Sequence, residues 1–370
     1  MARPIRARVD LAAIASNTRL AADLAPGARM VAVVKADGYG HGAVAVARAL
    51  ARLSRTRPSG SQPPPRAFGV ASLEEALTLR DAGIAQPILL MAGVFSKDEL
   101  AEVAGRRLEP VVHCHEQLEL LLAARLDGAL RVWLKMDTGM HRLGFAPDDF
   151  ADAWRRLGAA PQVSEIVAMT HLARADELDS DATSRQSELF RSATRGLEAP
   201  ASLANSAAVL AWPECHGDWI RPGIMLYGVS PLDRPTDPAA RLEPAMELVS
   251  EIVAVRELAA GEAVGYGGRF VCDRPTRIGV VAAGYADGYP RHAPDGTPVL
   301  VGGRRARLAG RVSMDLITVD LEGLEGIAVG DPVELWGKAL PAREVADRCG
   351  TIAYELFTGV TARVPREYHG

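Results

Sequence analysis

The chain has few cysteines, and no two of them are close together. Only four occur in 370 residues, Cys114, Cys215, Cys272 and Cys349. Metal sites and small disulfide-rich folds use closely paired cysteines, which this spacing does not offer. We therefore expect no metal centre, and buried or unreactive thiols in a reducing compartment.

Long apolar runs and an excess of one charge are also missing. No run reaches the ~20 residues that span a bilayer. The N-terminal segment alternates charged with apolar residues and lacks the apolar centre of a signal peptide. The net charge of -4, with scattered lysine and arginine, gives no basic surface for nucleic acid or an anionic membrane. We therefore expect a cytoplasmic protein that binds neither nucleic acid nor membrane.

What the chain does have is enough length and apolar content for a large core, with 48% hydrophobic residues. Through the first two thirds, short β-rich runs alternate with helical segments, as in a parallel sheet with crossover helices. Eight such runs predict an α/β fold of the (β/α)₈ TIM-like barrel type, and a doubly wound open sheet is the alternative. The runs are 30–34, 68–71, 87–91, 109–113, 131–136, 165–170, 201–204 and 219–226.

The composition changes near 231–244, and the remainder predicts a mostly β C-terminal domain. Alternating runs with glycine turns lie at 246–255, 277–283, 298–301, 316–321 and 332–336, with one helical stretch at 342–349. We therefore predict a barrel domain over 10–235 and a β-rich domain over 236–370. The segment 54–66, rich in Pro, Ser and Arg, predicts a surface loop, and a proline-rich docking motif is the alternative.

Lys35 lies where a buried hydrophobic strand opens into a glycine-rich turn. Lysine seldom lies beside a strand core unless it is paired. A desolvated amine loses its proton more easily and can form an imine with an aldehyde or ketone. For this window alone, a lysine that extends to solvent from the strand end is an equal alternative.

Polar residues recur at the C-terminal ends of the other predicted strands, where barrel enzymes carry their chemistry. The segments 205–207 and 221–224 offer a hydroxyl and backbone N–H groups that suit a phosphate dianion, although each alone could be an ordinary loop turn. The strand-end residues are Lys135, Asp137, Arg142, His171, Asn205, Ser206, Arg221, Gly223 and Tyr227.

The chain carries a series of motifs at 33–42, 135–144, 170–171, 204–206, 221–224, 264–267, 284–291, 313–315 and 363–366. Together they resemble the successive motifs of the alanine racemase family. The resemblance spans nearly the whole chain and implies a pyridoxal 5'-phosphate (PLP) enzyme with a barrel, a β-domain and a head-to-tail homodimer. It also implies that residues 1–9 pack with the β-domain.

The resemblance implies a role for each matching residue. Lys35 would hold PLP covalently and act as one catalytic base, and Tyr266 of the partner subunit would be the other. Arg142 and the backbone N–H of Met314 would bind the substrate carboxylate, and Lys135 matches a lysine that the family often carries as a carbamate. The remaining cofactor-binding residues would be Tyr39, His171, Asn205, Ser206, Arg221, Gly223, Ile224 and Tyr354. The supporting and entrance residues would be Lys135, Asp176, Tyr285, Arg291, Arg311 and Asp315.

The use of two catalytic bases has a geometric reason. Loss of the Cα proton leaves a planar centre, so inversion requires a proton donor on the opposite face. His171 and Arg221 match groups that support the tyrosine and link it to the cofactor ring nitrogen. A guanidinium does not readily give that nitrogen a proton, so Arg221 would weaken the electron sink and suppress transamination.

The expected reaction is the interconversion of L- and D-alanine, either to supply D-alanine for peptidoglycan or to catabolise alanine. A broader-specificity or serine racemase is the alternative, because Ser313 stands where many family members have cysteine. A decarboxylase of basic amino acids would be expected to place an acidic residue at Arg221. A non-catalytic cofactor-carrying barrel would lack Tyr266 and the second domain.

Overall fold

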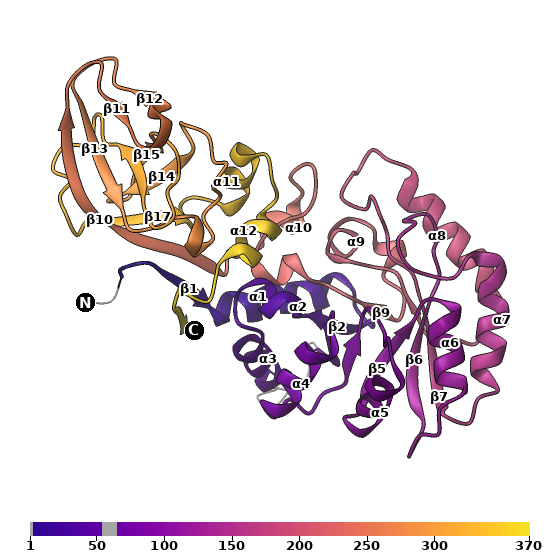
Figure 1. Cartoon of the computed structure of the whole chain (residues 1–370). Coiled ribbons are helices and arrows are strands. Elements are labelled where there is room, and N and C mark those ends of the chain that lie inside the picture. Colours follow the sequence, from indigo (N-terminus) through magenta and orange to yellow (C-terminus); the bar gives the residue numbers. More distant parts are fainter. Residues whose placement is uncertain (1–2, 54–64) are drawn as a thin grey trace. The chain divides into compact units, whose positions relative to one another are not determined.

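The computed structural model describes residues 3–53 and 65–370. The predicted loop at 54–66 therefore lies almost entirely outside the described residues. The chain forms two compact units (Figure 1). The barrel unit comprises 14–38 and 43–242, and the β-rich unit comprises the residues up to Ala13, Tyr39–Gly42 and Glu243–Gly370. Within the described ranges, every helix is too short or too polar to cross a bilayer.

Eight parallel strands make the sheet of the barrel unit, each paired with its neighbour in the order β9-β2-β3-β4-β5-β6-β7-β8. Between β8 and β9, the N–H groups of Asp218 and Arg221 donate to the carbonyls of Ala201 and Ala204, each at 2.9 Å, which closes the barrel. The predicted (β/α)₈ architecture is confirmed. The strands are β2 (Arg29–Val33), β3 (Ala67–Val70), β4 (Ile88–Leu90), β5 (Leu108–Val112), β6 (Leu130–Lys135), β7 (Val163–Met169), β8 (Ala201–Ser202) and β9 (Trp219–Ile220).

Helices connect these strands, and several begin at residues that cap a helix well. Ser72 and Ser96 each accept a hydrogen bond from the N–H of a glutamate three residues later, at the starts of α4 and α5. The helices are α1 (Leu11–Leu24), α2 (Lys35–Tyr39), α3 (Ala43–Arg52), α4 (Leu73–Asp81), α5 (Lys97–Gly105), α6 (His115–Leu122), α7 (Pro147–Gly158), α8 (Ala182–Ala193), α9 (Ser206–Ala211) and α10 (Asp237–Ala240), with 3₁₀ turns η1 (Pro213–Cys215) and η2 (Ile224–Tyr227).

The eighth strand is shorter than the sequence predicts. The run 219–226 was expected to be one strand, but β9 ends at Ile220 and the chain turns into η2 at Ile224. Pro222 has no N–H to donate to a sheet, which explains why the apolar run does not continue as a strand. The turn leaves Arg221 and Gly223 at the C-terminal end of the barrel.

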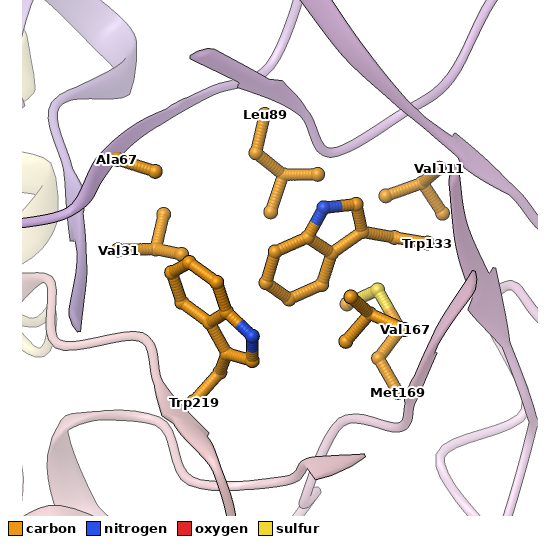
Figure 2. Close-up of a cluster of buried hydrophobic side chains, with 8 residues drawn as sticks. All are labelled: Val31, Ala67, Leu89, Val111, Trp133, Val167, Met169 and Trp219. Carbon is orange, nitrogen blue, oxygen red and sulfur yellow. The ribbon is translucent and has the colours of Figure 1, made fainter. Parts of the chain in front are cut away.

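Side chains fill the interior of the barrel (Figure 2). Seven of its eight strands contribute to one buried cluster, in which the rings of Trp133 and Trp219 meet edge to face with centroids 5.2 Å apart. The indole N–H of Trp133 donates to Glu109 Oε2 at 2.8 Å. A packed interior is not a pore, so a ligand must bind at a mouth of the barrel. The cluster consists of Val31, Ala67, Leu89, Val111, Trp133, Val167, Met169 and Trp219.

Replacing Trp133 with alanine should destabilise the barrel unit by about 3–5 kcal/mol, because it opens a cavity and removes a partner of the buried Glu109. Trp133→Phe should cost less, since most of the ring volume remains. Urea unfolding followed by far-ultraviolet circular dichroism measures both. Similar midpoints for wild type and Trp133→Ala would show that this ring does not support the core.

The β-rich unit is a second closed sheet. Its strands pair in the order β13-β16-β15-β14-β17-β10-β1-β18, and β10 also pairs with β13, which closes the ring. The N-terminal strand β1 runs antiparallel to β10 and parallel to β18. The strands are β1 (Arg6–Asp10), β10 (Met246–Leu258), β13 (Thr276–Val281), β14 (Pro298–Val301), β15 (Arg304–Leu308), β16 (Ile317–Asp320), β17 (Pro332–Trp336) and β18 (Arg366–His369).

The mostly β character of this unit is confirmed, but several elements were missed. The helix α11 (Ala342–Cys349) is where the sequence predicts one, whereas a second helix, α12 (Ala353–Gly359), was not expected. The strand β15 is mostly exposed and rich in arginine, so it has no apolar alternation to reveal it. The unit also contains β11 (Ala263–Val264), β12 (Phe270–Val271) and the 3₁₀ turns η3 (Tyr266–Gly268) and η4 (Tyr285–Asp287).

Candidate active site

Lys35 lies two residues after the end of β2 and opens a turn of left-handed helix. Ala36, Asp37 and Tyr39 have φ angles of 52°, 51° and 53°, and the N–H of Gly38 donates to the carbonyl of Val34 at 2.8 Å. A residue with a side chain costs about 1–2 kcal/mol in this conformation. Strain of this kind persists where the surrounding structure holds it, often at a functional site.

The second half of this turn is held by close packing. The carboxylate of Asp37 accepts a hydrogen bond from the N–H of Ala43 at 2.8 Å. A Cβ on Gly38 would lie 3.1 Å from the Ala43 nitrogen, so a side chain at this position would crowd that backbone. The turn is therefore tightly constrained between Lys35 and the start of α3.

The amine of Lys35 is easier to deprotonate than an ordinary lysine. Burial is the main reason that its pKa is lowered from 10.5, and the positive charge of Arg142 acts in the same direction, while Glu75 opposes both. A neutral amine is the nucleophilic form. The environment of Lys35 therefore favours attack on a carbonyl compound.

Lys135 and His171 contribute to the same electrostatic environment. Lys135 ends β6 and is 6% exposed, and its pKa falls to about 8, mainly through burial and then through Arg221 and Arg142. Burial, followed by the same arginines and the two lysines, lowers the pKa of His171 well below 6.5. His171 is therefore neutral at pH 7, and the cationic groups at this mouth repel one another.

Arg221 is fixed at the end of β9 and is almost completely buried. Its two terminal nitrogens donate to Ser202 Oγ and to the carbonyls of Thr170 and Leu203, the bond to Thr170 being 2.7 Å long. Its Nε has no hydrogen-bond partner among the described residues. An arginine nitrogen can only donate, so this position suits a ligand atom that accepts a hydrogen bond.

The loops after β8 and β9 are joined by a serine. Ser206 is 5% exposed, and its Oγ accepts a hydrogen bond from the N–H of Gly223 at 2.8 Å. Asn205 caps α9 by accepting from the N–H of Ala208, and its amide donates to the carbonyl of Leu172. These contacts bring together the two segments that the sequence marks as a phosphate site, with Ile224 buried at the start of η2.

Arg142 and Asp176 lie in longer loops at the same ends of the strands. Arg142 is exposed in the loop after β6, and no hydrogen bond or ion pair of its guanidinium is found within residues 3–53 and 65–370. The carboxylate of Asp137 orders this loop by accepting from three successive backbone N–H groups. Within the described residues, the guanidinium of Arg142 therefore lies on an ordered loop without a polar partner. Asp176 is half-buried.

The other predicted site residues lie in the β-rich unit. The rings of Tyr39 and Tyr354 have centroids 5.9 Å apart. Burial raises the pKa of Tyr39 to about 12, so its phenol stays protonated and can donate a hydrogen bond. Tyr266 is 72% exposed. The next residue, Gly267, lies close to Arg311, since a Cβ added to Gly267 would be 3.7 Å from the guanidinium carbon of Arg311.

Two further loops of this unit lie against each other. The N–H groups of Tyr285 and Ala286 donate to the carbonyls of Ser313 and Met314, both at 3.0 Å. A Cβ on Gly284 would lie 2.3 Å from the Met314 oxygen, so only glycine permits this approach. Asp315 accepts from Arg363, and Arg291 is exposed.

The structure therefore brings the predicted barrel residues, Asp176 included, to one mouth, whereas Tyr266, Tyr285, Tyr354 and the other entrance residues belong to the β-rich unit. Sequence reasoning missed Glu75, whose carboxylate binds the backbone next to Lys35. The pattern Ser72-x-x-Glu75 signals a helix cap, but it carries no information about a bond to another strand.

Comparisons with known proteins identify the family of the chain. Residues 9–231 match the family described as "Alanine racemase, N-terminal domain", and residues 245–368 match "Alanine racemase, C-terminal domain". The chain belongs to the alanine racemase family. It is therefore an enzyme of the isomerase class.

Relatives in the alanine racemase family match along their whole length. The alanine racemase of Chromohalobacter salexigens is 56% identical over 100% of this chain and 98% of its own, and the catabolic alanine racemase of Pseudomonas putida is 54% identical over 100% and 99%. The structure of the biosynthetic alanine racemase from Pseudomonas aeruginosa is 50% identical and covers 100% of both chains, with a TM-score of 0.94. That of Bartonella henselae alanine racemase with covalently bound pyridoxal phosphate is 29% identical over 99% of both chains, with a TM-score of 0.89.

Proposed function

We propose that this chain interconverts L- and D-alanine with PLP held at the C-terminal mouth of the barrel. The observation that carries the proposal is the set of cationic groups at this mouth, the buried Lys135 and Arg221 and the half-buried Lys35, which all interact with a neutral His171. A phosphate dianion and a substrate carboxylate would compensate these charges. The Nε of Arg221, which has no hydrogen-bond partner among residues 3–53 and 65–370, suits the ring nitrogen of the cofactor, which accepts a hydrogen bond when it is not protonated.

In this proposal, the chain consists of a cofactor-binding barrel over 10–235 and a β-rich domain over 236–370. Lys35 would hold the cofactor covalently, while Asn205, Ser206, Gly223, Ile224, Tyr39 and Tyr354 would hold its phosphate end. When bound, PLP supplies an electron sink that makes the proton on the substrate Cα acidic. His171 and Arg221 would orient the ring and support the tyrosine base.

Two residues would move the proton at Cα. The amine of Lys35 would exchange it on one face, and the phenol of Tyr266 would exchange it on the other. Tyr266 is largely exposed in the single chain, so it is available to a second copy. We therefore propose a head-to-tail homodimer in which Tyr266 of the partner subunit completes the site.

Substrate selection would depend on a carboxylate clamp and a narrow entrance. Arg142 and the backbone N–H of Met314 would bind the carboxylate, and Lys135 would support Arg142. The loops that carry Tyr285 and Met314 pack against each other, and in this proposal the ring of Tyr285 would narrow the entrance to favour a small amino acid. Asp176, Arg291, Arg311 and Asp315 would line the entrance, and the enzyme would work in the cytoplasm.

The decisive experiment measures initial racemisation rates on a panel of L-amino acids with purified, PLP-loaded protein. D-alanine should form fastest, and the protein should carry a visible chromophore. Equal or faster conversion of serine would favour the broader-specificity alternative. No D-amino acid from any substrate would reject the proposal.

Lys135 should carry a carbamate when carbon dioxide is present. With a pKa of about 8, about a tenth of its amine is neutral at pH 7 and able to attack carbon dioxide, far more than for an exposed lysine. The resulting negative charge would lie among Arg142, Arg221 and Lys35. At a fixed dissolved carbon dioxide concentration, the carbamate should increase as the pH rises through 8.

Nuclear magnetic resonance with ¹³C-labelled carbon dioxide detects the carbamate carbon directly. The signal should be present in the wild type and absent from Lys135→Gln. A signal that survives in Lys135→Gln would place the carbamate elsewhere, and no signal up to pH 9 would rule it out.

A further inference from the structure

Glu75 connects the backbone that follows Lys35 to the neighbouring strand. Its Oε1 accepts a hydrogen bond from the N–H of Ala36 at 2.6 Å, and its Oε2 accepts one from the N–H of Ala71 at 2.7 Å. Ala36 directly follows Lys35, and Ala71 directly follows β3. One carboxylate therefore ties together the ends of two adjacent barrel strands, at the point where the left-handed turn begins.

Glu99 shows which part of this arrangement is ordinary helix capping. It occupies the same position in α5 as Glu75 does in α4, three residues after a capping serine. Its Oε2 accepts from the N–H of Phe95 at 2.7 Å, just as Glu75 accepts from Ala71. Capping thus explains the bond to Ala71, but it does not explain the bond from Glu75 to Ala36.

The bond to Ala36 lies at the start of the strained left-handed turn. Ala36 and Asp37 both hold positive φ angles that residues with side chains rarely adopt. A hydrogen bond to an ionised carboxylate is stronger than one between neutral groups. Loss of this bond would let the backbone at Ala36 change conformation. The direction in which the Lys35 side chain leaves the backbone would then no longer be fixed.

Glu75 also acts on the charge of the Lys35 amine. The titratable and charged groups that interact with Lys35 are Glu75 from α4, Lys135 and Arg142 from β6 and its following loop, and His171 after β7. Glu75 is the acidic member of this set and raises the pKa of Lys35, against burial and Arg142.

We propose that Glu75 is a positioning residue for Lys35, holding the left-handed turn through Ala36 and placing a negative charge near the Lys35 amine. The proposal rests on the proposed function for the role of Lys35, but the contacts themselves do not depend on a cofactor.

Glu75→Gln is the main test, with Glu99→Gln as the matched control in the full-length protein. A glutamine has one accepting oxygen in place of two, so at least one of the Ala36 and Ala71 amides should exchange its hydrogen about tenfold faster or more. Acylation of Lys35 across a pH series, after removal of any bound cofactor, should show a midpoint at lower pH than in the wild type. Glu99→Gln should change neither measurement.

Glu75→Asp separates charge from reach. It keeps the negative charge with a shorter side chain, so the Lys35 midpoint should return toward the wild-type value while amide exchange at Ala36 or Ala71 stays fast. A wild-type Lys35 midpoint in folded Glu75→Gln would overturn the proposal. If Glu75→Gln does not fold, unchanged exchange at both alanines in Glu75→Asp would overturn it. Failure of the proposed function would appear separately, as the absence of a cofactor on Lys35.

Discussion

Replacing Lys35 with alanine should abolish racemisation, lowering the rate by about 10³-fold or more. A positioned acid or base alone contributes roughly 10²–10⁴-fold, and Lys35 would also be the covalent attachment point of the cofactor. Borohydride reduction of the wild-type protein should leave a pyridoxyl group on Lys35, identified by peptide mass spectrometry. Lys35→Ala should carry no such group at any residue.

Lys97 provides the matched control, because it is an exposed lysine at the start of α5. Lys97→Ala should keep both the racemisation rate and the borohydride adduct of the wild type. An adduct on a lysine other than Lys35, or a substantial rate in Lys35→Ala without added amine, would remove Lys35 from its proposed role. Weak rescue of Lys35→Ala by a small free amine is compatible with that role, since the amine replaces the missing base.

The barrel and the polar residues at its mouth could be predicted from the sequence for a simple physical reason. The buried strands of a parallel barrel are short continuous apolar runs, so each polar residue that ends such a run marks a C-terminal strand end. The sequence predicts the positions of Lys35, Lys135, His171 and Arg221 in this way. Parallel pairing then requires these ends to meet at one mouth.

Features that depend on contacts between distant segments could not be predicted. The bond from Glu75 to Ala36 joins residues 39 positions apart, and the sequence near Glu75 predicts only its local cap. In the part of the chain that the structure describes, the Nε of Arg221 lacks a partner because the three acceptors around the guanidinium all bind its terminal nitrogens. The strain at Ala36 is also hidden, because alanine rarely adopts a left-handed conformation and therefore does not signal such a turn.

The arrangement of charge suggests why the site is assembled from so many segments. Lys35, Lys135, Arg142 and Arg221 come from three different strand ends, and each lowers the pKa of the half-buried His171. Such a cluster of cations is costly unless anions compensate it. A phosphate, a carbamate and a substrate carboxylate would each supply one anion, so cofactor binding should stabilise the folded barrel as well as enable the reaction.

The proposed shared site predicts that two inactive variants can restore each other. Lys35→Ala lacks the base on the barrel, and Tyr266→Ala lacks the base on the β-rich unit. Each homodimer should be inactive by itself. If the dimer has two-fold symmetry and each site combines Lys35 of one subunit with Tyr266 of the other, a hybrid dimer has one site with both defects and one intact site.

Mixing the two variants and allowing their subunits to exchange should therefore restore activity. With random exchange, about half of the dimers are hybrids and each has one intact site of two, so the ceiling is roughly a quarter of wild-type activity. Native mass spectrometry with one isotope-labelled variant verifies the exchange, and a mixture of Lys35→Ala with wild type controls for losses during handling. If both residues of a site came from the same chain, every site in the mixture would keep one defect. No recovery after verified exchange would then exclude the shared site, whereas recovery near the ceiling requires Tyr266 to act on the Lys35 site of its partner.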